Sequence, residues 1–230
     1  MHKGFLLLCL FFVAVFILMS VWQWHRYDYK KTLMNKFEAR LKTLPMPFQL
    51  LQFQNDLQFQ PIAVDGEYDN DLQFLQNRLH DGVLGFEVLT PFRIAGSQKL
   101  LLIDRGWIKK PDNASLPFIP VVSSLEHLTG YIKILDEYQF ILGKNIIEPD
   151  KKPLIMQKID VEEISRITKK DFYPYILRLD PINENGFVRD WVISSTLPER
   201  HLMYALQWLA FSLVVIFGFF YFSLERRTHE

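Results

Sequence analysis

The chain has 230 residues, enough for one large domain or two small ones. Its 26 basic and 26 acidic side chains cancel, so no net charge attracts nucleic acid and we expect none as a partner. A hydrophobic content of 49% excludes a disordered chain. The single cysteine, Cys9, excludes an intramolecular disulfide and a CxxC metal site.

Two apolar segments bracket the chain. Residues 4–24 and 202–224 carry no charged side chain, and each is long enough to cross about 30 Å of hydrocarbon as a helix. A cleaved signal peptide is the alternative for the first segment, but no small-x-small cleavage site precedes Trp22. The sequence therefore predicts two transmembrane helices, in contact with lipid, around a domain of residues 25–201, with a tail of residues 225–230.

The two spans place both chain ends on one side of the membrane. Lys3 precedes the first span, Arg226 and Arg227 follow the second, and basic residues favour the cytoplasmic side. Lys30 and Lys31 argue against this orientation, but long loops are exported largely regardless of charge. We therefore expect cytoplasmic termini and a periplasmic central domain. Because no targeting presequence precedes the first span, we expect a bacterial inner membrane rather than a mitochondrial one.

The central segment is patterned mostly as β-strands. Strands are predicted over residues 61–68, 72–79, 84–92, 99–108, 128–135, 153–158, 175–179 and 187–193. The polar runs at 69–71 and 95–97 are typical of hairpin turns, and a proline-rich stretch predicts a loop over 112–122. Short turns between strands favour a mainly antiparallel β domain, an α+β barrel or sandwich.

Helical segments are expected at two places in this domain. Apolar residues at helical spacing over 27–44 prolong the first span until Pro45 stops the helix. Residues 161–170 predict a short amphipathic helix, with Asp160 as its N-cap.

The start of the second span is the best candidate site. The sequence contains no phosphate-binding, zinc-protease or serine-nucleophile motif, so we do not expect an enzyme. One helix face carries His201, Ala205, Trp208 and Ser212, and Tyr204 lies beside it. An imidazole at the edge of such a face could ligate haem iron. The alternative is an interfacial histidine that is satisfied by water.

The end of the first span offers a second histidine and a cationic face. Two antiparallel spans place His25 at a depth close to that of His201, so a two-histidine site is geometrically possible. Trp22, Arg26 and Lys30 recur every four residues and share one face. Arg26 could meet a carboxylate such as a haem propionate, or it could contact lipid phosphate.

The clearest string in the central domain is LLIDRGWI, at residues 101–108. Asp104 and Arg105 are neighbours on a strand, so their side chains point to opposite faces and cannot easily pair. Gly106 permits a tight bend. One interpretation is therefore a structural corner, and the other is that an exposed Trp107 anchors a partner.

Together these strings resemble the Surfeit-locus-one family of cytochrome c oxidase assembly factors. The matching motifs, in chain order, are WQxxRxxxK at 22–30, VxGxY at 64–68, GxxVxTP at 85–91, IDRGW at 103–107 and HxxYAxQW at 201–208. The resemblance covers nearly the whole chain, although residues 144–187 match loosely. Met203 stands where the family has glycine, and its side chain would crowd a flat ligand at that turn.

The resemblance implies a non-enzymatic assembly factor in a respiratory membrane. Such a factor would help deliver haem a to subunit I of the oxidase or retain it there, with His201 as the transient haem ligand. Tyr204 and Trp208 would pack the ring, and Arg26 would meet the propionates.

The implied partners are subunit I and other oxidase assembly factors. Arg105, Gly106 and Trp107 would contribute to the contact with them. The alternative function is a haem-independent scaffold that holds an oxidase assembly intermediate.

Overall fold

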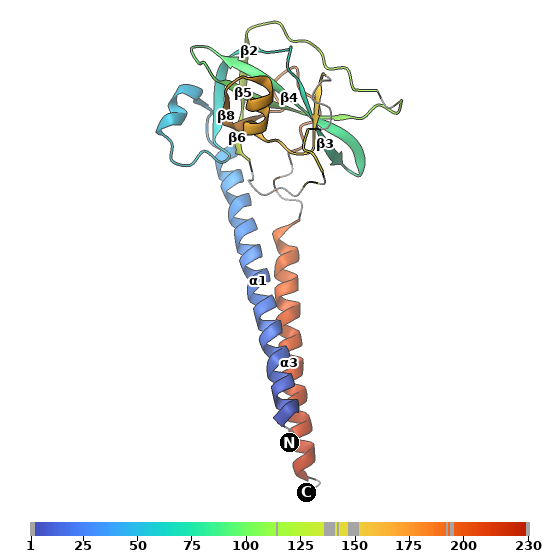
Figure 1. Ribbon diagram of the computed structural model, residues 1–230. Coiled ribbons are helices and arrows are strands. Elements are labelled where there is room, and N and C mark those ends of the chain that lie inside the picture. Colours follow the sequence, from blue (N-terminus) through green and yellow to red (C-terminus); the bar gives the residue numbers. More distant parts are fainter. Residues whose placement is uncertain are drawn as a thin grey trace. The chain divides into compact units, whose positions relative to one another are not determined.

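A computed structural model describes residues 3–113, 115–135, 141, 143–146, 152–191, 193 and 196–228. The chain forms two units, a helix pair within Met1–Glu38 and Val192–Glu230, and a β domain, Ala39–Trp191 (Figure 1). The predicted fold class, two apolar helices that bracket a mainly antiparallel β domain, is confirmed.

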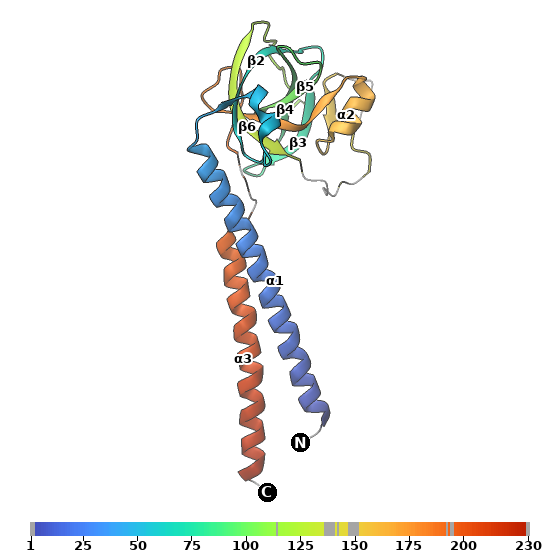
Figure 2. The ribbon, with the colours of Figure 1, turned by 90° about the vertical axis from the view of Figure 1, so that its left-hand side faces the viewer.

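The helix pair consists of α1, Lys3–Leu41, and α3, Pro198–Thr228. The helices run antiparallel, so both chain ends lie at the same end of the pair (Figure 2). By length and composition, both helices could cross a membrane, and they contain the two predicted spans. As the helical spacing predicted, α1 continues past residue 24 and stops before Pro45.

Contacts between α1 and α3 recur at a constant register. Phe5 stacks on Phe219 with ring centroids 6.0 Å apart. Nearer the other end of the pair, the hydroxyl of Ser20 donates to the carbonyl oxygen of Ala205 at 2.9 Å. As the residue number rises along α1, the number of the contacting residue on α3 therefore falls by almost the same amount.

The β domain is a sheet that closes on itself. Its elements are β1 (Met46–Pro47), the 3-10 helix η1 (Phe48–Phe53), β2 (Pro61–Tyr68), β3 (Phe74–His80), β4 (Val83–Ile94), β5 (Leu100–Lys109), β6 (Glu126–Ile134), β7 (Leu154–Met156), α2 (Val161–Thr168) and β8 (Phe172–Leu179). The strand order is β1-β2-β6-β8-β5-β4-β3-β7, and β2 also pairs with β4. The strands β2, β6, β8, β5 and β4 therefore form a closed ring, a small barrel.

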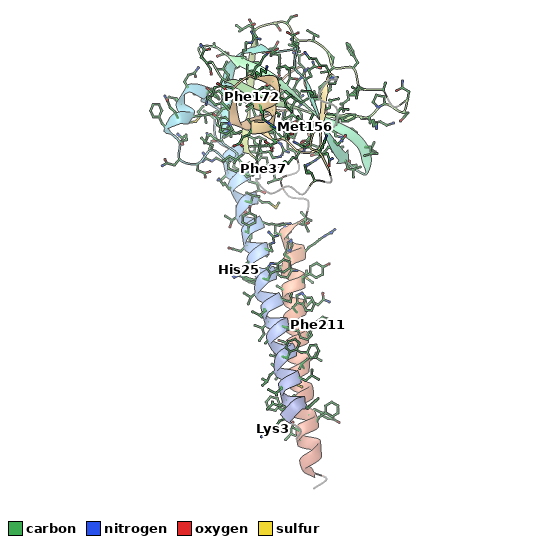
Figure 3. The ribbon with its side chains drawn as sticks, in the orientation of Figure 1. Lys3, His25, Phe37, Met156, Phe172 and Phe211 are labelled. Atoms are coloured by element: carbon green, nitrogen blue, oxygen red, sulfur yellow. The ribbon has the colours of Figure 1, made fainter. Side chains whose placement is uncertain are left out.

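The ring has an apolar core inside and a second one on its outer face. Residues such as Ile62 and Ile103 point inward from the ring strands. Alternate residues point outward, because side chains on a strand alternate between its faces. There Phe172 and Met156 (Figure 3) pack with Ile164 of α2. This alternation decides which face each residue of the LLIDRGWI string occupies.

Two turn predictions have different outcomes. The turn at 95–97 joins the antiparallel strands β4 and β5, as predicted. The run at 69–71 is not a hairpin turn, because β2 pairs with β4 and β6 rather than with β3. The hairpin partner of β3 is β4, and Asp81 and Gly82 turn between them with φ angles of 48° and 77°, which match the right-handed twist of paired strands.

The last predicted strand is absent. Residues 187–191 form no strand, and Val188 makes a single bridge to Trp107; residue 192 of the predicted strand lies outside the described residues. The predicted helix is confirmed as α2, and its N-cap too, because Oδ1 of Asp160 accepts a hydrogen bond from the amide of Glu163 at 3.0 Å.

Candidate functional site

His201 lies in the first turn of α3 and contacts α1. Its Nδ1 is 2.7 Å from Oε1 of Gln23. An amide oxygen can only accept a hydrogen bond, so Nδ1 carries the proton and Nε2 keeps its lone pair. Nε2 is buried and has no hydrogen-bond partner among the described residues. The imidazole therefore presents one nitrogen whose lone pair can accept a hydrogen bond or coordinate a metal ion.

The rest of the predicted face of α3 packs against α1. Ala205 is 2% exposed and Ser212 is 1% exposed. The ring of Trp208 stacks on Phe16 with centroids 5.7 Å apart. Small residues allow two helices to approach closely. The residues that predicted a platform for a flat ligand thus form the contact between the two helices.

Two other predicted site residues lie on exposed flanks. Tyr204 is 52% exposed on α3. The guanidinium of Arg26 lies over the ring of Trp22, 6.0 Å from its centroid. The positive charges of Lys30 and Arg26 act on the ring of His201. An anionic group bound beside His201 would therefore meet a favourable potential.

The structure does not bring the two histidines together. His25 lies on α1 with an exposed side chain (Figure 3). It is two residues from Gln23, about 200° around the helix, and Gln23 faces His201. In the described part of the chain, no three His, Cys, Asp or Glu side chains gather as a metal site. His201 is therefore not part of a metal site with three such ligands among these residues.

Arg105 is buried inside the β domain and is only 1% exposed. Its guanidinium carbon is 5.1 Å from the ring centroid of Tyr68 and 5.2 Å from that of Phe187. Its Nε donates to the carbonyl oxygen of Asn185 at 2.8 Å. Among the described residues it forms no salt bridge. Aromatic faces and a charge-assisted hydrogen bond therefore stabilise this cation in place of a carboxylate.

Residues 180–191, which we call the strap, follow β8 and pack against β5. The amide of Trp107 donates to the carbonyl oxygen of Val188 at 2.7 Å, and the amide of Val188 donates back at 3.0 Å. Gly106 has φ 109°, and a Cβ there would be 2.5 Å from the same Val188 oxygen. Arg105, Gly106 and Trp107 thus hold the strap, which supports the interpretation as a structural corner; we call these three residues the clasp.

Only Trp107 of the clasp reaches the surface. Its ring centroid is 5.1 Å from that of His80, and its Nε1 donates to the carbonyl oxygen of Arg78 at 3.2 Å. The ring crosses β4 at Gly85, where a Cβ would be 2.4 Å from it. Arg105 is too buried to contact a partner, so the predicted partner surface remains a prediction for Trp107.

The opposite face of β5 carries a buried charged cluster. Oδ2 of Asp104 is 3.5 Å from Nε of Arg178, and Asp104 is 0% exposed. Burial and the carboxylate of Glu87 raise the pKa of Asp104 to about 7, against the attraction of Arg178. Burial and Arg178 lower the pKa of Lys133 to about 8. Trp191, at the end of the strap, covers Arg178 with its ring centroid 4.7 Å from the guanidinium carbon.

Comparison with known proteins assigns the family. The sequence model of the SURF1 protein family matches residues 10–213. The chain belongs to the SURF1 family. An uncharacterized SURF1-like protein of Mycobacterium tuberculosis is 24% identical over 97% of this chain and 84% of its own length. A SURF1-like protein of Dictyostelium discoideum is 32% identical over 46% of this chain and 42% of its own length. The SURF1 family is known for oxidase assembly factors rather than enzymes.

The partner of His201 has only a weak signal in the sequence. Gln23 is part of the WQ string, and its one sequence signal is a polar amide within a charge-free span. Its contact with His201 depends on the register of two helices that are far apart in sequence. For the strap, the apolar pattern predicted a strand over residues 187–193, but in the structure Val188 alone bridges to β5, so the pattern did not reveal how the strap packs.

Proposed function

We propose that this SURF1-family chain assists delivery of haem a to subunit I of cytochrome c oxidase, or its retention there, and that other assembly factors take part. Haem a combines an apolar ring and tail with two carboxylates, so a carrier holds it best where hydrocarbon meets water. The proposal includes a bacterial inner membrane, cytoplasmic termini and a periplasmic β domain. The start of α3, between a charge-free span and cationic side chains of α1, suits such a cargo.

One observation carries the proposal, the free and buried Nε2 of His201. An unpaired buried polar group costs about 1–3 kcal/mol, so a ligand that occupies it restores stability. Neutral imidazole is a common axial ligand of haem iron. Because Nε2 is buried, the atoms around it must move before a ligand can reach it. That cost weakens binding, which suits a carrier that must release its cargo.

The surroundings of His201 support a ring on the exposed flank of α3. The face with Ala205 and Trp208 is occupied by α1, which leaves the flank with Tyr204 for an aromatic ligand. Arg26 is exposed and can make charge-assisted hydrogen bonds to propionates.

The test is the absorption spectrum of the full chain purified from membranes that make haem a. We expect stoichiometric haem a in the wild type and its loss in His201→Ala. His25→Ala is the matched control, because it removes an exposed histidine on α1 and should leave the spectrum unchanged. Haem retained in His201→Ala would contradict the assigned ligand. A wild type without haem, despite normal folding and a supply of haem a, would contradict haem delivery.

A haem-independent scaffold is the second candidate function. The tip of the β3–β4 hairpin favours it, because Leu79 is 62% exposed and Leu84 is 63% exposed. Exposed apolar side chains of this kind are typical of protein contacts. A scaffold requires that Leu79→Ser with Leu84→Ser abolishes association with subunit I. It also requires that His201→Ala leaves oxidase assembly intact.

A further inference from the structure

We infer that Gln23 is a positioning residue for His201. Its side-chain oxygen determines which imidazole nitrogen carries the proton. This leaves Nε2 unprotonated, as the nitrogen that can coordinate iron. The identity of the ligand rests on the proposed function, whereas the choice of tautomer does not.

The first step is the tautomer. A neutral imidazole protonates at either nitrogen, and its hydrogen-bond partner selects the form. Nδ1 of His201 lies 2.7 Å from Oε1 of Gln23, which fits one short hydrogen bond. Metal-binding histidines usually donate their second ring N–H to an oxygen acceptor in this way. Gln23 provides that acceptor before any ligand binds.

The second step is the support of Gln23 by its neighbours on both sides. One turn before it on α1, Ser20 donates to the carbonyl oxygen of Ala205 at 2.9 Å. Further along α1, Nζ of Lys30 donates to the carbonyl oxygen of Thr196 at 3.4 Å. These contacts hold the register that places Gln23 opposite His201.

The third step is the cost of an amide at this position. A polar side chain in a charge-free span is unfavourable unless it is hydrogen-bonded. Leucine has a similar size and would pack between the helices without this cost. The hydrogen bond to His201 gives a physical reason for glutamine at position 23, and it makes Gln23→Leu the informative variant.

The test without haem is nitrogen NMR of the full chain in lipid nanodiscs, with labelled histidine. The signals of His201 are identified by their loss in His201→Ala. We expect protonated Nδ1 and unprotonated Nε2 in the wild type, and the same pattern in Gln23→Glu, which keeps an oxygen acceptor. Gln23→Leu should shift the population towards protonated Nε2. Ser20→Ala removes a neighbouring interhelical hydrogen bond and should leave the tautomer unchanged.

The outcomes separate this inference from the proposed function. Protonated Nε2 in the wild type, or the same tautomer in Gln23→Leu, would overturn the inference. With haem a added, Gln23→Leu should lose about 10- to 100-fold in affinity, Gln23→Glu should restore it and Ser20→Ala should retain it. Equal affinity of wild type and Gln23→Leu would overturn the positioning role. If the wild type binds no haem, the proposed function fails, and the NMR result still decides whether Gln23 selects the tautomer.

Discussion

Arg105 and Arg178 are both buried in the β domain, but the chain stabilises their charges differently. Arg105 lies between the rings of Tyr68 and Phe187 and donates to a backbone oxygen. Arg178 pairs with Asp104, in a cluster with a second carboxylate. The direct partners of Arg105 do not change charge near neutral pH, whereas Asp104 does. One side of β5 therefore holds the strap independently of pH, and the other side responds to protons.

Arg105→Ala should have the largest effect on stability, and it tests the pH-independent side of β5. It removes the cation between two rings and leaves the carbonyl oxygen of Asn185 without its donor. We expect a loss of roughly 3–5 kcal/mol in the free energy of unfolding, from the cavity that forms, the lost contacts with the two rings and the unpaired oxygen. Urea unfolding of the full chain in detergent measures this loss. Arg105→Lys keeps the charge without the planar group, so a loss equal to that of alanine would show that planarity decides the contact.

Gly106→Ala tests the backbone contact on the same side of β5. The new Cβ would meet the Val188 oxygen at 2.5 Å in a backbone with φ 109°, so we expect a loss of roughly 2–4 kcal/mol. Gly96→Ala is the matched control, because its φ is 80° and no atom lies within 4 Å of the new Cβ. It should cost about 1 kcal/mol from backbone strain. Equal losses in the two variants would contradict a close contact with the strap.

The charged side is tested by the pH dependence of stability. Burial raises the pKa of Asp104 from 3.8 to about 7, so between these values the folded chain holds a proton that the unfolded chain has released. Stability therefore falls as pH rises through this window, by at most about 1.4 kcal/mol per pH unit. Asp104→Asn should flatten the slope between about pH 4 and 7.

Thermal unfolding at a series of pH values measures this slope. Asp112→Asn changes an exposed carboxylate and should keep the wild-type slope. A wild-type stability that rises through this window would contradict a protonated Asp104 in the folded chain. A slope that survives in Asp104→Asn would assign it to another group.

The sequence predicted the parts of the fold that depend on local patterns. Charge-free runs identified both spans, and alternation identified seven of the eight predicted strands. Local patterns could not predict the pairing of β2 with β4 and β6, because closure of the ring joins strands that are distant in sequence. Residues 187–193 are as apolar as a strand, but in the structure residues 187–191 lie over the clasp, and Val188 makes their one bridge.

The candidate site shows the same limit. The helical spacing correctly grouped His201, Ala205, Trp208 and Ser212 on one face, yet that face packs against α1 instead of remaining open to a ligand. Whether a face is open depends on the neighbouring helix, which spacing within one helix does not include. For the same reason the sequence allowed two facing histidines, where the register places an amide opposite His201.

The clasp also limits how far the connection between β8 and α3 can extend. With the strap held as far as Trp191, only residues 192–197 separate the last anchored residue from the start of α3, a reach of about 20 Å when extended. With the strap released from the end of β8, residues 180–197 form the connection, and its reach grows to about 60 Å. A pull on α3 would therefore load the contact of Trp191 with Arg178 first, and then the hydrogen bonds of Val188, before it reached the barrel strands.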